Sequence, residues 1–485
     1  MTYYLAIDQG THASRACLFD EAGLLVSEHT KNIQLKRISS THIEQDAGEI
    51  IDSVKEVVAK LLHEVHPQRT IAACGIAIQR SSVLAWQSDG TAISPVLSWQ
   101  DTRGSQQLDD LRETESEIQH LSGLPLSAHY GATKLHYLQC EAKTRGIATE
   151  TLRLSPLISY LLFHILEEHP YIVDHTNAQR TQLFSIAELD WSARLAELFK
   201  VPLQTLPDCV PVLNHTGTAH GNLSGTEIPV TAISGDQNAA FYDTGSLTSE
   251  TALVNLGSGA FVLSLLPHYQ TSKKQLSTIA CSENSTVQYV REATINGAGS
   301  ALEWLEKKYD ISDLWEQLPT WLTAIGPDET GQPPIFINSI GSLGSPWWNN
   351  SIEPKFIIDD NSANNAKTEL VSLDPELRAV AVIESIVFMI CINLEIMQSE
   401  QTLNRLRVCG GLSQLDGLCQ RLADLSALQV ERLRSPEATA RGIAWLAAGK
   451  PDAWSHADVE TFKPKNNITL CKRYAMFSAV LNKAI

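Results

Sequence analysis

The sequence predicts a two-domain α/β protein whose two halves share one plan, and three observations support this. The chain has 485 residues, more than one compact core normally holds. A strand–turn–strand pattern at residues 3–19 returns half a chain later at residues 251–266, which indicates a duplicated architecture. Helical patterns lie between these two hairpins. We expect the domain boundary within residues 243–249, which gives domains of residues 1–244 and 245–485.

In the N-terminal half, a hairpin comes first and a helix and buried strands follow. A polar turn at residues 8–11 separates the first two strands. Apolar residues recur at helical spacing in residues 49–63, which predicts an amphipathic helix. Apolar runs predict strands at residues 3–7, 15–19, 24–26, 71–78, 96–99 and 230–233.

In the C-terminal half, the second hairpin pairs residues 251–256 with residues 260–266 across a turn of small residues. Residues 376–397 predict a long, largely buried helix. A strand at residues 407–409 then leads into two glycines and a helical pattern that ends near Leu425. Residues 202–211 and 326–334 are typical of loops.

Composition argues against several functional classes. With 55 acidic and 37 basic residues the net charge is −18, and such a charge repels nucleic acids and anionic membranes. The nine cysteines never form a CxxC spacing, and their odd count suits reduced thiols in the cytoplasm. Residues 1–10 lack a secretory signal pattern. The most apolar stretches, residues 157–166 and 379–392, are interrupted and shorter than the roughly 18 residues of a membrane span.

Three turns of small residues could bind phosphate or nucleotide. Gly10 and Thr11 offer amides and a hydroxyl to an anion, and the preceding Asp8 could hold a hydrated magnesium ion. Taken alone, this segment is more often an ordinary Asx turn. Residues 257–259 and 410–411 form two further turns after strands, so the set would suit two domains that close around one nucleotide.

Polar residues at the ends of strands suggest a site for chemistry. Asp236 follows the apolar strand at residues 230–233, where a rigidly held carboxylate could act as a general base; the simpler alternative is a helix N-cap. Residues 79–82 and 99–103 also follow strands, and their polar groups with Trp99 suit a polyhydroxylated ligand. A surface Arg–Asp pair beside a half-buried tryptophan explains the latter pattern equally well.

Taken in order, these motifs resemble those of the FGGY carbohydrate kinases, in the actin-like ATPase superfamily. The resemblance implies two ribonuclease-H-like α/β domains with a catalytic cleft between them. It also implies phosphoryl transfer from ATP, with Mg²⁺, to a hydroxyl of a small sugar or polyol. The matching blocks are residues 6–15, 43–46, 78–80, 99–101, 123–125, 133–134, 174–177, 235–237, 257–259, 298–299, 410–411 and 437–442.

The resemblance implies a role for each matching residue. Asp236 would be the catalytic base, and Asp8 would orient magnesium through water. The implied substrate-binding residues are Arg80, Ser81, Trp99, His129, Asp236 and Gln237. The implied nucleotide-binding residues are Thr11, His12, Arg15, Gly257, Ser258, Gly299, Glu303 and Gly411.

Two departures from the wording of glycerol kinases bear on the substrate. Those enzymes have a glutamate where this chain has Ser81 and a tyrosine where it has His129, and both family side chains bond glycerol hydroxyls. A missing partner costs about 1 to 3 kcal/mol, or roughly five- to 150-fold in affinity. The smaller Ser81 also enlarges the pocket, which favours a pentulose or a longer polyol. The Met-His pair of xylulose kinases is absent here.

On the nucleotide side, His12 and Glu303 replace a threonine and a glutamine, and Leu415 stands where the family has an adenine-contacting asparagine. These changes leave nucleotide preference open. Three alternatives therefore stay open: a true glycerol kinase in which Ser81 and His129 act through water, an actin-like ATPase, and a non-catalytic sugar sensor. The sequence also leaves the oligomeric state open, a homodimer included.

Overall fold

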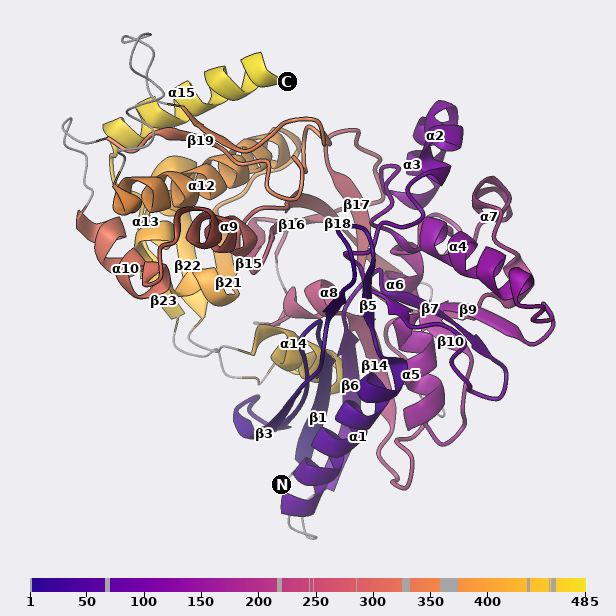
Figure 1. The fold of residues 1–485 in the computed structure, drawn as a ribbon. Helices are drawn as coiled ribbons and strands as arrows, with labels where there is room; N and C mark the ends of the chain where they lie inside the picture. The colour runs from indigo at the N-terminus through magenta and orange to yellow at the C-terminus, as the bar shows by residue number, and fades with distance from the viewer. Residues whose placement is uncertain are drawn as a thin grey trace.

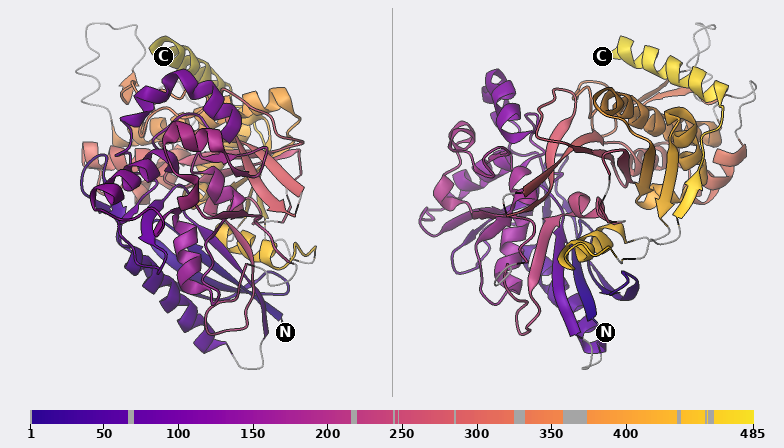
Figure 2. Two further views of the ribbon diagram at one scale, coloured as in Figure 1. Left: turned by 90° about the vertical axis from the view of Figure 1, so that its right-hand side faces the viewer. Right: turned by 180° about the vertical axis from the view of Figure 1, so that it is seen from behind.

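Two large mixed β-sheets, one in each half of the chain, form the framework of the protein (Figure 1). The computed structural model describes residues 2–65, 70–215, 220–243, 245–246, 248–284, 286–324, 332–357, 374–433, 437–452, 454 and 459–485. The indigo and magenta N-terminal half and the orange and yellow C-terminal half lie side by side in Figure 1 and in the rear view of Figure 2.

The N-terminal sheet has the strand order β14-β6-β1-β2-β3. Strand β2 runs antiparallel to its neighbours β1 and β3, while β6 and β14 lie parallel to β1. These strands are β1 (Thr2–Gln9), β2 (Ala13–Asp20), β3 (Leu25–Asn32), β6 (Thr70–Ile78) and β14 (Val230–Gly235). The sequence predicted each of them, but it made β3 too short, because this polar edge strand is held by pairing with β2 rather than by burial.

The C-terminal sheet has the order β17-β18-β16-β15-β21-β22-β23. Strands β18-β16-β15-β21-β22 repeat the order and directions of β3-β2-β1-β6-β14, and this repetition confirms the predicted duplication. The strands are β15 (Thr251–Leu256), β16 (Ala260–Leu266), β17 (Leu276–Glu283), β18 (Thr286–Ile295), β21 (Arg405–Cys409), β22 (Gln429–Leu433) and β23 (Val459–Phe462).

A smaller sheet inserted in the N-terminal half carries the predicted substrate side. Its strands, in spatial order, are β4 (Lys36–Arg37), β5 (Ile43–Gln45), β8 (Val96–Leu97), β7 (Val83–Gln87) and β9 (Leu152–Pro156). Helix α4 (Gly131–Thr144) packs on β7 and β9. Strand β8 ends two residues earlier than predicted, which leaves Trp99 in the connection that follows it.

Helices cover both sheets. Asp46 caps α1 (Ala47–Glu64) by accepting from the Glu49 amide at 2.9 Å, and the apolar face of α1 packs on β2 and β3. The other helices are α2 (Gln107–Leu111), α3 (Glu115–Ser122), α5 (Leu157–Ile165), α6 (His175–Gln179), α7 (Ala193–Phe199), α8 (Asp236–Ala240), α9 (Gly299–Tyr309), α10 (Leu314–Ala324), α12 (Pro375–Glu400), α13 (Asp416–Ser426), α14 (Ala438–Ala447) and α15 (Ile468–Ala484).

Short elements complete the fold. The predicted loop at residues 202–211 contains a 3₁₀ turn (Leu203–Thr205) and β13 (Asp208–Val210), because that strand pairs with β10 (Ile172–Asp174). Much of the predicted loop at residues 326–334 lies outside the described residues. The remaining strand pairs are β11 (Phe184–Ser185) with β12 (Asp190–Trp191) and β19 (Ile335–Ile337) with β20 (Lys355–Ile357).

The predicted long buried helix is α12. Within the described ranges it is the one helix long and apolar enough to cross a membrane by length and composition alone. However, 83% of its most apolar stretch is buried inside the protein, where it packs on α9, α10 and α13. Packing in the core therefore accounts for its apolarity.

Helix α14 links the two halves. It follows the C-terminal strand β22 in sequence, yet it packs on β1, β6 and β14 of the N-terminal sheet and on α8 (Figures 1 and 2). Contact is close, since a Cβ added to Gly442 would lie 1.9 Å from the Ala239 carbonyl oxygen. The division at residues 244 and 245 stays a prediction.

Candidate functional site

The first hairpin turn is held in place by side chains of the small sheet. The Gly10 amide donates to the Ala13 carbonyl at 2.9 Å, which closes the turn. Gln45 donates to the Thr11 carbonyl at 2.8 Å, and Trp99 Nε1 donates to the Thr11 hydroxyl at 3.0 Å. Because that hydroxyl accepts from Trp99, its own proton is available to an anion. The neighbouring His12 is exposed.

Carboxylates from both halves surround Arg15 beside this turn. Arg15 Nη1 lies 2.8 Å from Glu437 Oε2, just before α14, and 3.9 Å from Asp8 Oδ2. Burial, together with the charges of Asp236 and Glu437, raises the pKa of Asp8 to about 7 against the opposing charge of Arg15. Asp8 and Asp236 are thus electrostatic neighbours.

This donor set fits a hydrated divalent cation. Within the part of the chain that the structure describes, no three His, Cys, Asp or Glu side chains group into a metal cage. Magnesium typically uses one or two carboxylates, several waters and the phosphates of a substrate rather than a protein cage. Asp8, whose side chain is 12% exposed, would hold such an ion through water.

Replacing Asp8 by Asn should raise the free energy of unfolding near pH 8 by roughly 1 to 4 kcal/mol. Because the folded-state pKa of Asp8 is raised from 3.8 to about 7, ionisation costs stability as pH rises between these values. Denaturant unfolding of both proteins at pH 4 to 8 measures this. A gap that widens up to about pH 7 and then levels supports the electrostatic assignment; a constant gap contradicts it.

Asp236 lies where β14 ends and α8 begins, and its backbone is fixed from behind. The Thr176 hydroxyl accepts from the Gly235 amide at 2.9 Å, and Asp236 Oδ1 accepts from the Gln237 amide at 2.7 Å. Gly235, not Asp236, occupies the N-cap position of α8, so the structure contradicts the N-cap alternative. The side chain is 26% exposed, and the surrounding protein raises its pKa despite the nearby Arg80.

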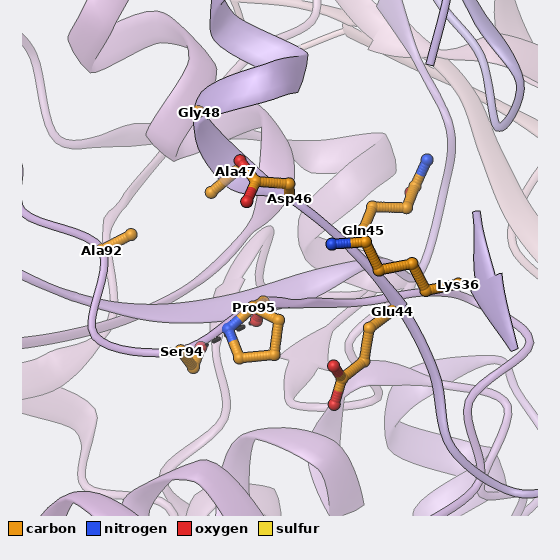
Figure 3. Close-up of a pocket in the computed structure, with 9 residues that line it drawn as sticks. All are labelled: Lys36, Glu44, Gln45, Asp46, Ala47, Gly48, Ala92, Ser94 and Pro95. Atoms are coloured by element: carbon orange, nitrogen blue, oxygen red, sulfur yellow. Dashed lines mark hydrogen bonds between the residues drawn. The ribbon is translucent and has the colours of Figure 1, made fainter. Parts of the chain in front are cut away.

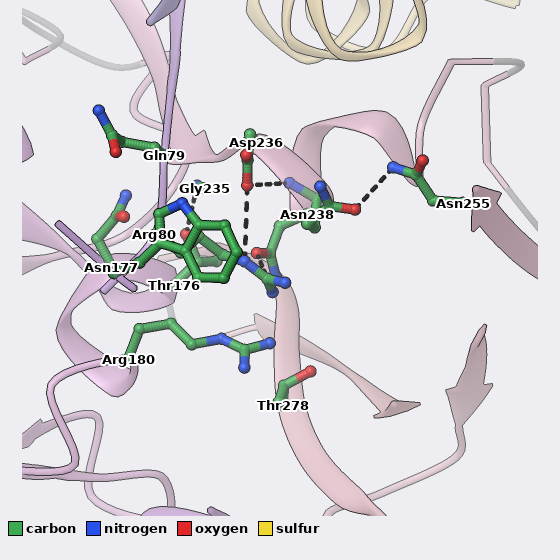
Figure 4. A network of polar contacts seen from close by, with 12 residues as sticks. Gln79, Arg80, Thr176, Asn177, Arg180, Gly235, Asp236, Asn238, Asn255 and Thr278 are labelled. Atoms are coloured by element: carbon green, nitrogen blue, oxygen red, sulfur yellow. Dashed lines mark hydrogen bonds and ion pairs between the residues drawn. The ribbon is translucent and has the colours of Figure 1, made fainter. Parts of the chain in front are cut away.

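Arg80 supports Asp236 from within a buried charge cluster (Figure 4). Figure 4 shows Arg80 beside Asp236, and its Nε lies 3.6 Å from Asp236 Oδ1. Its two terminal nitrogens each lie 3.4 Å from a carboxylate oxygen of Glu292 on β18. Arg180 also pairs with Glu292. Burial acts to raise the pKa of Glu292, but Arg180 and Arg80 outweigh it and lower the pKa to about 2. With 7% of its side chain exposed, Arg80 mostly contacts protein rather than open space.

Three residues of this region escaped the sequence reasoning: Glu292, Arg180 and Phe261, whose ring lies 5.6 Å from the Arg80 guanidinium. A signal existed for Glu292, because an acid between the apolar residues Val290 and Ala293 of a strand requires a partner if that strand is buried. Nothing local marked Arg180 or Phe261, since their neighbours come from distant parts of the chain.

Ser81, Trp99 and His129 lie on three segments that Lys134 joins on the predicted substrate side, and we call these three residues the substrate wall. Ser81 has a left-handed backbone (φ 64°), and its buried hydroxyl has no hydrogen-bond partner among the described residues. The rings of His129 and Trp99 meet edge to face at 5.5 Å. Burial, with Lys134 next, lowers the pKa of His129 to about 3, so its imidazole is neutral and can donate and accept.

Gln237 connects this side to the C-terminal sheet, because its Oε1 accepts from Asn255 Nδ2 at 2.6 Å. Of the implied nucleotide residues, Gly257, Ser258 and Gly411 follow β15 and β21, and Gly299 and Glu303 lie at the start of α9. The amides of Gly299 and Ser300 donate to the carbonyls of Gly257 and Ser258 at 3.0 Å, which joins that turn to the start of α9.

Two glycines after β21 leave the backbone of this region without side chains. Gly410 has φ 87°, and a Cβ there would lie 2.6 Å from the Leu256 carbonyl oxygen, so only glycine fits. Gly411 is exposed with open space around it. Glu303 is exposed one turn into α9, whereas Leu415 packs against the core. The structure thus brings the two glycine turns and Glu303 to one end of the C-terminal sheet.

A separate cavity of about 280 Å³ lies at the start of α1 (Figure 3). Lys36, Asp46 and Pro95 are among its lining residues, and none of the predicted site residues lines it. One lining residue, Gln45, also donates a hydrogen bond to the Thr11 carbonyl, so it joins this cavity to the hairpin turn.

Comparison with known proteins concerns the family and the fold of the chain. Family models of the FGGY carbohydrate kinases match residues 3–243 (N-terminal domain) and 252–449 (C-terminal domain). A glycerol kinase of Synechocystis sp. is 29% identical over 483 residues, covering 96% of this chain and 94% of that protein.

Solved structures show the same fold. The crystal structure of Plasmodium falciparum glycerol kinase with ADP has a TM-score of 0.83 at 21% identity, covering 100% of this chain and 98% of that one. Ligand-bound xylulose kinase from Lactobacillus acidophilus has a TM-score of 0.81 at 17% identity, with the same coverages. At these identities the likeness concerns the fold.

Proposed function

Because the chain belongs to the FGGY family of carbohydrate kinases, which transfer a phosphoryl group to an alcohol, we propose that it phosphorylates a pentulose or longer polyol with ATP. The observation that carries this proposal is the accessible Asp236 carboxylate at the end of β14, an electrostatic neighbour of Asp8 in the first hairpin. In this proposal Asp236 faces the hydroxyl of the acceptor, and Asp8 faces the phosphates of the nucleotide.

In the proposed mechanism, Asp236 accepts the proton of the attacking hydroxyl while Arg80 and the Gln237 amide hold its carboxylate in position. The Thr11 hydroxyl, Arg15 and the hairpin amides bind the terminal phosphates. The turns at Gly257 and Gly411 admit the rest of the nucleotide. When bound, Mg²⁺ neutralises charge on the transferring phosphoryl group, and Asp8 would hold it through water.

The substrate wall supports a preference for substrates longer than glycerol. Where glycerol kinases carry a glutamate, the smaller Ser81 has a buried hydroxyl with no hydrogen-bond partner among the described residues. A buried polar group without a partner is costly, so a substrate hydroxyl that reaches Ser81 would be favoured. His129 offers a neutral imidazole on the same wall. We place the enzyme in the cytoplasm, a proposal supported by its nine free cysteines, and leave a homodimer as a proposal.

A panel of glycerol, pentuloses and longer polyols with magnesium ATP tests the function, with ADP and the phosphorylated product both measured. We expect kcat/KM for the best pentulose or polyol to exceed that for glycerol by about tenfold or more. Preferred, saturable glycerol phosphorylation would instead establish a true glycerol kinase, which the name of the Synechocystis relative favours. ATP hydrolysis that no alcohol stimulates would overturn the proposal.

Restoring the glycerol-kinase residues should reverse the preference. Ser81→Glu with His129→Tyr supplies two hydrogen-bonding partners and fills the enlarged space, so glycerol should gain about five- to 150-fold in kcat/KM relative to the best longer substrate. The single variants apportion the gain between the two positions. An unchanged ratio in the double variant, with ATP KM intact, would show that other residues set the length of the substrate.

A further inference from the structure

Lys134, on α4, donates all of its side-chain hydrogen bonds to main-chain carbonyls. Its Nζ donates to the carbonyl oxygens of Ser81 at 2.7 Å, Ser98 at 3.1 Å and His129 at 3.0 Å. An ammonium has three N–H donors, so all three are engaged. The side chain is 0% exposed.

No carboxylate accepts from this ammonium in the part of the chain that the structure describes. The nearest acid that acts on it, Asp101, is bonded by Arg103 at 2.7 Å and by the Ile43 amide at 2.7 Å. Burial accordingly lowers the pKa of Lys134 to about 7, with Asp101 opposing and Arg103 adding to the shift. A buried cation without a direct counter-ion is costly, so its retention requires a specific benefit.

The three carbonyls belong to three separate segments, and each segment carries one group of the substrate wall. Ser81 follows β6, Ser98 directly precedes Trp99, and His129 lies just before α4. The left-handed backbone of Ser81 is the strained member of the set. One ammonium therefore fixes the hydroxyl, the indole and the imidazole of the wall relative to one another.

We infer that Lys134 is the positioning residue of the substrate subsite: it sets the spacing of Ser81, Trp99 and His129 and thereby determines sugar KM and specificity. This inference rests on the proposed function, in which that wall binds the acceptor. The turns at Gly257 and Gly411, which admit the rest of the nucleotide, lie on the other half of the protein, so ATP binding should depend on Lys134 much less than sugar binding does.

Lys134→Met keeps the volume of the side chain and removes its three donors. We expect sugar KM to rise about five- to 150-fold and discrimination against glycerol to fall by a similar factor, with ATP KM changed less than about twofold. Lys143→Met, an exposed position on the same helix, is the matched control and should change none of these values. Thermal unfolding is recorded for every variant.

A second variant separates positioning from mere stability. Lys134→Ala leaves a cavity the size of propylammonium, which should restore sugar KM, whereas 1-propanol, of the same shape with a single donor, should not. The inference is wrong if propylammonium and 1-propanol both restore sugar KM. It is also wrong if sugar KM and ATP KM rise together as stability falls. If the wild type is active and the Lys134→Met variant keeps its sugar KM, the inference about Lys134 is wrong and the proposed function stands. If the wild type phosphorylates no alcohol, the inference and the proposed function are both wrong.

Discussion

Asp236→Asn is expected to lower kcat for the best substrate by about 10² to 10⁴-fold, the range typical of a lost general base. Asparagine keeps the shape of the side chain and can still accept from the Gln237 amide, but it cannot take the hydroxyl proton. Arg80 retains Glu292 as a partner, so the charge cluster behind the site should persist. The sugar and ATP KM should change only a few-fold.

Steady-state kinetics of the purified variant measure this, with circular dichroism to verify the fold. Asp52→Asn, an exposed change of the same kind on α1, is the control and should leave kcat unchanged. A loss below about tenfold in the Asp236 variant would show that another group removes the proton.

The acid side of the pH–rate profile gives a second view of the same residue. Burial raises the pKa of Asp236, and the pKa of Asp8 is raised to about 7. Both carboxylates act as anions in the proposed mechanism, so activity that falls as pH drops below about 7 is consistent with it. These two groups interact, and the titration therefore belongs to the pair.

Local sequence patterns predicted the fold well because its elements depend on local signals. The second hairpin was predicted at residues 251–256 and 260–266, the bounds of β15 and β16, since apolar runs flank a turn of small residues. The edge strand β3 was underestimated because its hydrogen bonds to β2 outweigh its polar composition. The residues of a strand do not by themselves indicate pairing with another strand of this kind, so its length could not be predicted from them.

The candidate site divides in the same way. Asp236 and the glycine turns could be selected because each follows a strand, and Asp8 because it stands near the end of β1. In the structure the charge of Asp236 acts on Asp8, as neighbouring strand ends allow. The assigned roles stay predictions. Glu292 and Lys134 act through partners far along the chain: Glu292 lies 212 residues from Arg80, and Lys134 lies 53 from Ser81. Only the folded arrangement shows that these pairs meet.

Gly442→Ala is the second change with a large expected effect, and here geometry and helix propensity predict opposite signs. Alanine in the middle of a helix is favoured over glycine by about 1 kcal/mol, so propensity alone predicts a more stable protein. The new Cβ, however, would lie 1.9 Å from the Ala239 carbonyl oxygen and 3.2 Å from the Asp243 amide nitrogen. Backbone occupies that space, so α14 must move away from α8 by more than 1 Å to reach an ordinary contact.

We expect this movement to destabilise the protein by about 3 kcal/mol or more, since neither helix can yield without disturbing the N-terminal sheet. Activity should fall as well, because α8 begins with Asp236 and α14 follows Glu437, the partner of Arg15. Gly48→Ala is the matched control: the new Cβ of this exposed glycine of α1 would meet only the capping oxygen of Asp46, at 3.2 Å, which needs to shift by a few tenths of an ångström at most. Thermal unfolding and kcat of both variants decide the matter, and a Gly442 variant as stable as the wild type would mean that α14 does not pack on α8 as closely as these distances require.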